Sequence, residues 1–371
     1  MPPARPLCRA VSKCALGVVS LSVCLSLAEG FARVFLPEVS DSFVVQTESL
    51  DAKYHHKPLW GVLPEPDPEA YRIAFLGDSF THGYPIKDRD EAFPAVVGRL
   101  LNERTIGRVG VRRVQSYNLG TPSYSPSIYG VALREITPAL RPHLVVVGLD
   151  DSDPQDDLLY QPLLVADPEG LPVSVHPGLP GVPGWLKPLA RRIKLVRLSF
   201  GLGDKVYRRF VVQEPRALKR WENRLGHYRP GPGTDAEWAR VFEHTLSLVA
   251  AMKAHCDDRG ITFCVVNYPY PPAVSTTAVV AWRKNFHFGK DRLYEPSFHV
   301  AVRAFCERRA IPYHDFTPIM RSLPDHKDLF LSDDDPHYSP RGHAALARSL
   351  VPFLSPLVDG QTVHDYDRSH D

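Results

Sequence analysis

The stretch RIAFLGDSFTHGYP, residues 72–85, joins an apolar run to Gly-Asp-Ser and then to a segment of helical character. Residues 72–76 predict a buried strand, and Ser79 follows shortly after its carboxyl end. Open α/β sheets place their functional side chains at this end of their strands. Asp78 and Ser79 are also good turn and helix-capping residues. The stretch alone therefore permits two interpretations, a displayed hydroxyl group or an ordinary strand end.

Apolar runs and helical periodicities alternate along most of the chain. The predicted strands are 72–76, 112–120, 143–149, 261–272 and the end of 297–316, and the predicted helices are 90–104, 125–140, 234–260, the start of 297–316, and 339–354. The run HLVVVGL, residues 143–149, is typical of a strand buried on both faces of a parallel sheet. Strands alternating with helices indicate βαβ units. We expect an α/β fold, a three-layer α/β/α sandwich with a mainly parallel, flavodoxin-like sheet.

The alternation stops at about residue 158 and resumes at about residue 234, which indicates an inserted cap region at about 158–233. Within it, residues 163–175 are typical of a hairpin, and residues 187–220 hold eleven Lys or Arg against two acids. This basic segment is either a solvated helix pair or a surface that attracts an anionic polymer or lipid. The expected organisation is an extended lead-in at 36–69, the main domain at 70–358 and a disordered tail at 359–371.

The N-terminal segment has the pattern of an export signal. Arg5, Arg9 and Lys13 precede an uncharged run from Cys14 to Ala28, as in a positive region followed by an apolar one. The run is short for a span of ~20 residues, although apolar residues resume after it. We expect residues 1–35 to be a signal anchor or a cleaved signal peptide, with a buried cytosolic helix as the remaining alternative. The main domain is then membrane-anchored or exported, in the periplasm or outside the cell.

Composition excludes several classes of function. The chain has 371 residues and a net charge of +2, which does not suit a nucleic-acid scaffold. Beyond the leader, Cys256, Cys264 and Cys306 have no CxxC spacing, so we expect free thiols, with one disulfide as the alternative. We expect no metal and no cofactor, and oligomeric state is left open.

A second candidate motif, DDDPHYSPRGH, lies at residues 333–343 before the last predicted helix. His337 follows Asp334 by three residues and Asp335 by two. A neutral imidazole, with a reference pKa near ~6.5, can take a proton from a serine hydroxyl. A neighbouring carboxylate orients the imidazole and stabilises its charged form. His343 is a competitor for the role of base.

Taken together, three blocks resemble those of the SGNH/GDSL hydrolase superfamily: GDSF (77–80), NLGTPSYSP (118–126) and DDPHYSPRGH (334–343). The resemblance covers about residues 70–158 and 235–355. It implies that Ser79 is the nucleophile and that the N–H groups of Ser79 and Gly120 hold the oxyanion. It further implies that His337 is the base. The usual spacing selects Asp334 as its partner, and the Asp-x-His of related periplasmic acyl-transfer branches selects Asp335.

One block departs from the family pattern. An Asn with an oxyanion-binding amide usually follows the third strand, but residues 145–157 read VVVGLDDSDPQDD. One register puts Asp150 in its place, and a longer register puts Ser152 there. Losing one such donor costs about 2.7–4 kcal/mol in the transition state, so we prefer Ser152, whose hydroxyl can donate. The alternatives are a protonated Asp150 and a degraded site.

The resemblance implies a serine esterase acting on carboxylic esters, with short acyl or O-acetyl groups on envelope glycans as the expected substrates, in contact with the membrane through the N-terminal segment. One alternative is an O-acyltransferase that modifies a surface polysaccharide. The alternative of another class is a catalytically degraded glycan-binding envelope protein.

Overall fold

The computed structural model describes residues 20, 22–35, 63–105, 113–161, 164–175, 193–194, 235–285, 288–289 and 292–359. The chain divides into two compact units, one comprising Met1–Asp51 and Pro177–Gln213, the other Ala52–His176 and Glu214–Asp371. Most of the inserted cap region and the tail at 360–371 lie outside the described residues.

The larger unit is built on a five-stranded parallel sheet in the order β2-β1-β3-β6-β7. The strands are β1 (Tyr71–Leu76), β2 (Val114–Asn118), β3 (Leu144–Asp150), β6 (Thr262–Tyr268) and β7 (Tyr313–Asp315). All seven residues of β3 are buried, because this central strand is covered on both faces. The predicted parallel sheet is confirmed.

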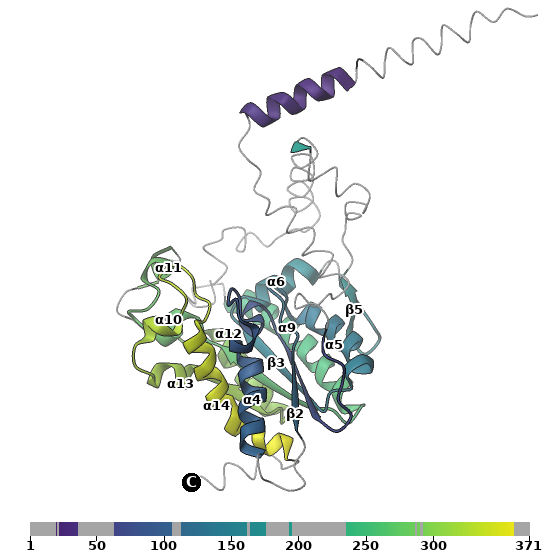
Figure 1. Cartoon of the computed structure of the whole chain (residues 1–371), viewed down its shortest axis with the longest axis vertical. Helices are drawn as coiled ribbons and strands as arrows, with labels where there is room; N and C mark the ends of the chain where they lie inside the picture. Colours follow the sequence, from purple (N-terminus) through teal and green to yellow (C-terminus); the bar gives the residue numbers. More distant parts are fainter. Residues whose placement is uncertain are drawn as a thin grey trace, which may run out of the picture. The chain divides into compact units, whose positions relative to one another are not determined.

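Side chains of the central strands alternate between two hydrophobic cores, as the period of two in a strand requires. In β1, Ala74 and Leu76 pack into one core, and Ile73 and Phe75 pack into the other. Helices α5 (Pro126–Leu140), α9 (Asp235–Asp257) and α12 (Ser297–Arg308) cover the first face. Helices α4 (Phe93–Thr105), α13 (Phe316–Ser322) and α14 (Pro340–Val358) cover the second (Figure 1). The predicted three-layer α/β/α sandwich is confirmed.

Shorter elements connect these layers. They are α3 (Ser79–His82), η1 (Arg89–Glu91), α6 (Asp153–Tyr160), α10 (Pro271–Val274), α11 (Val280–Asn285) and η6 (His326–Leu329). The hairpin expected at 163–175 is formed by β4 (Leu164–Ala166) and β5 (Pro172–Val175), and Gly170 in its turn has a φ of 86°. Cys256, Cys264 and Cys306 are buried free thiols, and burial raises the pKa of Cys256 to about 12.

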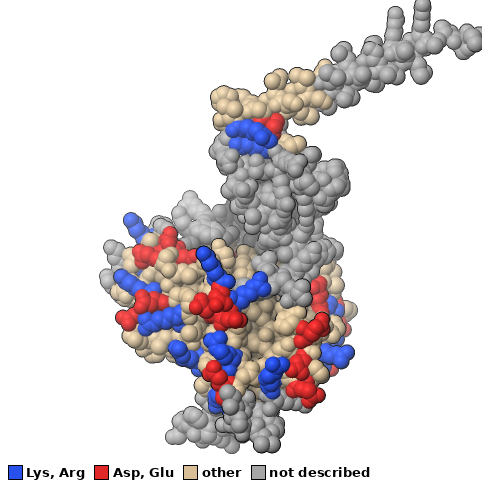
Figure 2. Space-filling model, in the orientation of Figure 1, with Lys and Arg blue, Asp and Glu red and all other residues tan. Residues whose placement is uncertain are grey.

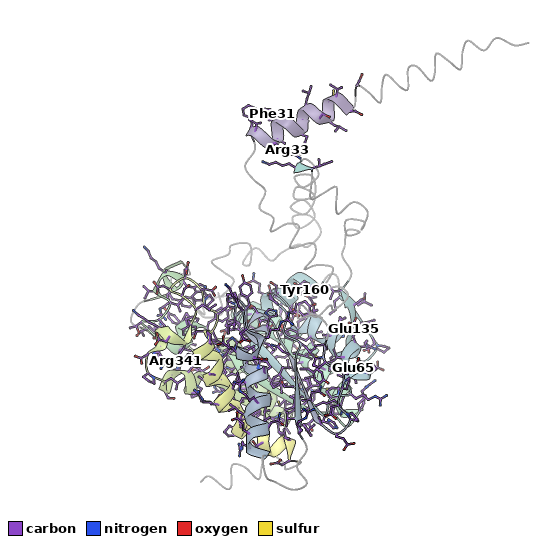
Figure 3. The ribbon with its side chains drawn as sticks, in the orientation of Figure 1. Phe31, Arg33, Glu65, Glu135, Tyr160 and Arg341 are labelled. Carbon is purple, nitrogen blue, oxygen red and sulfur yellow. The ribbon has the colours of Figure 1, made fainter. Side chains whose placement is uncertain are left out.

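In the smaller unit, residues 22–35 are helical. Phe31 and Arg33 project from this helix (Figure 3), and the Arg33 guanidinium donates to Glu29 Oε1 at 2.7 Å. Leu27, Val34 and several other large apolar side chains are exposed. Within the described part of the chain, we find no helix with the length and apolar character needed to cross a membrane. Most of the segment preceding this helix lies outside the described residues.

Candidate active site

Ser79 is presented by a tight turn between β1 and α3. Asp78 caps α3, since its Oδ1 accepts the backbone N–H of Phe80 at 2.9 Å. Gly83 ends the helix at a φ of 83°, a left-handed conformation that favours glycine. At Gly77, an added Cβ would collide with the side chain of Thr81. The sequence Gly-Asp-Ser thus folds so that α3 starts immediately beyond the end of the strand.

His337 lies in the loop that leads into α14. The backbone carbonyl of His337 accepts from the N–H of Leu331 at 2.9 Å. The hydroxyl of its neighbour Tyr338 donates to the carbonyl of Pro269 at 2.8 Å. The first bond ties the loop to the segment after η6, and the second ties it to the end of β6. The imidazole also contacts the ring of Phe80, with centroids 5.1 Å apart.

The structure brings Ser79 and His337 into contact, although 258 positions separate them in the sequence. Ser79 Oγ lies 2.8 Å from His337 Nε2. On the other side of the ring, His337 Nδ1 lies 2.6 Å from Asp335 Oδ1. Such a chain of hydroxyl, imidazole and carboxylate moves a proton from serine to histidine while the carboxylate stabilises the imidazolium.

The aspartate beside His337 is Asp335 and not Asp334, which differs from the preference drawn from the sequence. Asp335 Oδ1 also accepts the backbone N–H of His337 at 2.9 Å, so the two-residue spacing closes a local turn. Asp334 instead accepts from the hydroxyl of Ser332 at 2.6 Å, at the exposed side of the loop. The hydrogen bond from His337 holds the pKa of Asp335 below its usual value, which favours the carboxylate that the arrangement needs.

His343, the competing histidine, is fully buried in α14. Its Nδ1 accepts the backbone N–H of Phe93 at 3.3 Å, and its ring stacks on Phe93. Burial lowers the pKa of His343 to about 3, so it stays neutral. His343 is thus a packing residue between α14 and α4.

The expected oxyanion donors differ in their availability. The backbone N–H of Ser79 has no acceptor among the described residues. The N–H of Gly120 donates to the side-chain carbonyl of Asn118 at 3.0 Å. The Ser152 hydroxyl donates to Asp150 Oδ1 at 2.7 Å. Of the three, only the Ser79 N–H is uncommitted in the described structure.

Ser123, three residues after Gly120 in the same loop, is exposed and was not singled out from the sequence. Its φ of 62° is left-handed, an uncommon conformation for a residue other than glycine. Its N–H has no acceptor among the described residues, and its carbonyl accepts from the hydroxyl of Tyr160 at 3.1 Å. The same loop lies against the nucleophile turn, because the N–H of Thr121 donates to the carbonyl of Gly77 at 3.0 Å. No feature of the sequence predicts that the backbone N–H of Ser123 is left without an acceptor.

The described residues offer no cluster of three or more His, Cys, Asp or Glu arranged to hold a metal ion. Buried acids do gather behind the nucleophile. Asp78 and Asp150 are 5% and 1% exposed, and burial raises the pKa of each carboxyl.

Comparison with known proteins gives matches among solved structures. No family model matches the chain, and no curated protein matches it. A psychrotrophic esterase from Pseudoalteromonas sp. is 9% identical, with a TM-score of 0.42, over 78% of this chain and 99% of that one. An acetylxylan esterase from Geobacillus stearothermophilus is 11% identical, with a TM-score of 0.40, over 79% and 97%. A GDSL-like lipase from Bacteroides thetaiotaomicron is 11% identical, with a TM-score of 0.36, over 86% and 98%. The structural neighbours are consistently lipases and esterases of the GDSL (SGNH) type.

Proposed function

We propose that this protein is a serine esterase of the SGNH/GDSL type. The observation that carries the proposal is the continuous contact from Ser79 Oγ through His337 to Asp335. Ser79 Oγ attacks the ester carbonyl carbon while His337 Nε2 accepts its proton. His337 then gives this proton to the departing alkoxide, which leaves as the alcohol. Water, deprotonated by His337, releases the acyl group as a carboxylic acid and restores Ser79.

The oxyanion formed in each step needs hydrogen-bond donors. We assign the first to the N–H of Ser79. We assign the second to the N–H of Ser123 in place of that of Gly120, because the Gly120 N–H is already donated to Asn118. A backbone donor of this kind contributes about 2.7–4 kcal/mol to transition-state stabilisation.

Hydrolysis is favoured over acyl transfer by the exposure of the base. The side chains of His337 and Asp335 are 21% and 33% exposed, so the described residues do not seal this part of the site from solvent. A transferase must keep water from the acyl-enzyme, and the described residues leave this base open.

The proposed substrates are short acyl or O-acetyl esters on envelope glycans, at a site outside the cytoplasm. The positive N-terminal region and the apolar run after it support export or anchoring at the membrane. On the face shown in Figure 2, Lys and Arg side chains are interspersed with Asp and Glu. This mixed surface gives no support to nucleic-acid binding there.

The test is hydrolysis of p-nitrophenyl acetate and longer esters by the full chain in detergent. Ser79→Ala is expected to abolish turnover, and Ser322→Ala, which removes an exposed hydroxyl of α13, is the matched control. A fluorophosphonate is expected to label Ser79. Turnover that survives Ser79→Ala, or a protein that is neither active nor labelled, would overturn the proposal in favour of incidental chemistry or a glycan-binding protein. Labelling without hydrolysis would point to the transferase.

A further inference from the structure

Two buried carboxyl groups meet directly behind the nucleophile. Asp78 precedes Ser79 at the end of β1, and Asp150 is the last residue of the neighbouring strand β3. The ends of β1 and β3 lie side by side, since Leu76 pairs with Val147, and Asp78 and Asp150 are 5% and 1% exposed. Two buried carboxylates this close repel each other, and they can hydrogen-bond only when one of them is protonated.

The hydrogen-bond inventory of Asp150 supports that conclusion. Its Oδ1 accepts three donors: the N–H of Ser152 at 2.6 Å, the hydroxyl of Ser152 at 2.7 Å and the N–H of Asp153 at 3.2 Å. Its Oδ2 is buried, and no N–H or O–H of the described chain donates to it, which leaves this oxygen to accept a proton carried by Asp78. Asp150 therefore has the environment of an ionised carboxylate, and Asp78 is the partner that carries the proton.

Among the described residues, no Lys or Arg is one of the groups that act on the pair; the imidazoles nearby are His337, which contacts Ser79 Oγ at 2.8 Å, and His299, which lies 3.3 Å from Asp151 Oδ1. The titratable side chains that interact with the pair are Tyr129 of α5, Asp151 and Asp153 after β3, Tyr268 and Tyr270 at the end of β6, and Tyr338 before α14. None of these described groups is a cation. Burial, followed by repulsion from Asp150, raises the pKa of Asp78 well above its usual value. Like charges this close in a dry site cannot both ionise near neutral pH.

The protonation state of Asp78 affects the nucleophile. Ser79 Oγ lies 3.1 Å from Asp78 Oδ2 and 2.8 Å from His337 Nε2. Serine has one hydroxyl proton, so these two acceptors compete for it. A carboxylate is a strong acceptor, and a neutral carboxyl group is a weaker one. An ionised Asp78 would draw the proton of Ser79 away from His337, and would add negative charge near the developing oxyanion.

We propose that Asp78 and Asp150 share one proton, and that this proton keeps the Ser79 hydroxyl directed at His337. The pair is a positioning device, and its catalytic consequence rests on the proposed esterase function. Its loss of the proton at alkaline pH turns the site off. Asp78→Asn supplies the missing hydrogen permanently, because its amide can donate to Asp150 while its oxygen still caps α3. Asp150→Asn has the opposite effect, because its amide donates to Asp78 and favours the ionised form of that carboxyl group.

The first experiment is the pH dependence of kcat/KM for p-nitrophenyl acetate. The wild type is expected to lose activity on the alkaline side by about tenfold per pH unit once the pair ionises. Asp78→Asn is expected to stay within about threefold of its own neutral activity over the same pH range. Asp150→Asn is expected to have lost activity already at neutral pH, because it leaves Asp78 ionised. The control is Asp157→Asn, a buried acid of α6 bonded to Ser125 and Ser127, and it should keep the wild-type alkaline limb. An unchanged alkaline limb in Asp78→Asn would overturn the proposal.

The second experiment does not depend on activity. Infrared spectroscopy of the full chain at neutral pH is expected to show the carbonyl band of a protonated carboxyl group. The band should vanish in Asp78→Asn and Asp150→Asn and persist in Asp157→Asn. If neither of these two substitutions removes such a band, the proposal that Asp78 and Asp150 share a proton is overturned. If the protein hydrolyses no ester but the band behaves as expected, the pair stands and the esterase proposal fails.

Discussion

One carboxylate oxygen of Asp335, Oδ1, contacts His337 at two points. It lies 2.6 Å from the ring nitrogen Nδ1 of His337 and accepts the backbone N–H of His337 at 2.9 Å. One residue therefore sets both the turn of the backbone and the direction of the ring. Because Nδ1 faces the carboxylate, Nε2 is left to face Ser79 Oγ. The order of residues in this short loop decides which carboxylate does the orienting.

Replacing Asp335 by Asn is expected to cut kcat/KM for p-nitrophenyl acetate by about 10³–10⁴-fold, as the loss of the orienting carboxylate does in serine triads. The amide no longer stabilises the imidazolium and can hold the wrong tautomer. Asp334→Asn is the matched control, since Asp334 bonds only to Ser332 among the contacts described for it. Its activity should stay within about threefold of wild type, as for a surface change with no catalytic contact. The opposite ranking of the two variants would restore the assignment of Asp334.

Ser152→Ala tests whether this hydroxyl holds the oxyanion. The hydroxyl is donated to Asp150 Oδ1 at 2.7 Å, so it is not directed at a substrate. Loss of a true oxyanion donor costs about 10²–10³-fold in kcat. We expect Ser152→Ala to lower kcat by less than about tenfold, well short of that range. A loss of a hundredfold or more, measured with the same ester, would return Ser152 to the oxyanion site.

Much of the fold could be predicted because strands and helices leave strong local patterns. The apolar run at 143–149 corresponds to β3, and the run at 72–76 corresponds to β1, which the structure extends by one residue to Tyr71. Both runs end near the same edge of the sheet, where Ser79 follows β1. Side-chain type and periodicity were sufficient for that inference.

The finer arrangement of the site depended on backbone geometry that the residue types do not specify. Asp334 and Asp335 are adjacent acids, and only the path of the loop decides which one reaches His337. Gly120 is the residue that the family resemblance favours as an oxyanion donor, yet its N–H donates to the side-chain oxygen of Asn118. Ser123 has an ordinary residue type and an unusual φ. Tertiary structure determined each of these outcomes.

Ser123→Gly is expected to stabilise the protein. A left-handed φ costs an L-residue about 1–2 kcal/mol, whereas glycine adopts it freely at an entropic cost of about 0.5–1 kcal/mol. The net gain is about 0.5–1 kcal/mol, measured as a rise in the free energy of unfolding in urea. Ser123→Ala is the control, since it keeps both the strain and the N–H. Both variants should retain activity, because the proposed donor is the backbone. Destabilisation by Ser123→Gly would contradict the left-handed assignment.

The burial of His314 predicts how the stability of the folded protein responds to acid. Burial lowers its pKa to about 4 from 6.5, so between these values the unfolded chain binds more protons than the folded chain. The contribution of His314 to stability is therefore complete above pH ~6.5 and is lost as the pH falls toward about 4. Its ring packs against Phe316 and Phe353, with centroids 4.9 and 5.1 Å away, so a phenyl ring suits the site. In urea titrations between pH 7 and 4.5, His314→Phe should lose less stability on acidification than the wild type. Equal losses in the two proteins would show that His314 does not stay neutral in the folded chain.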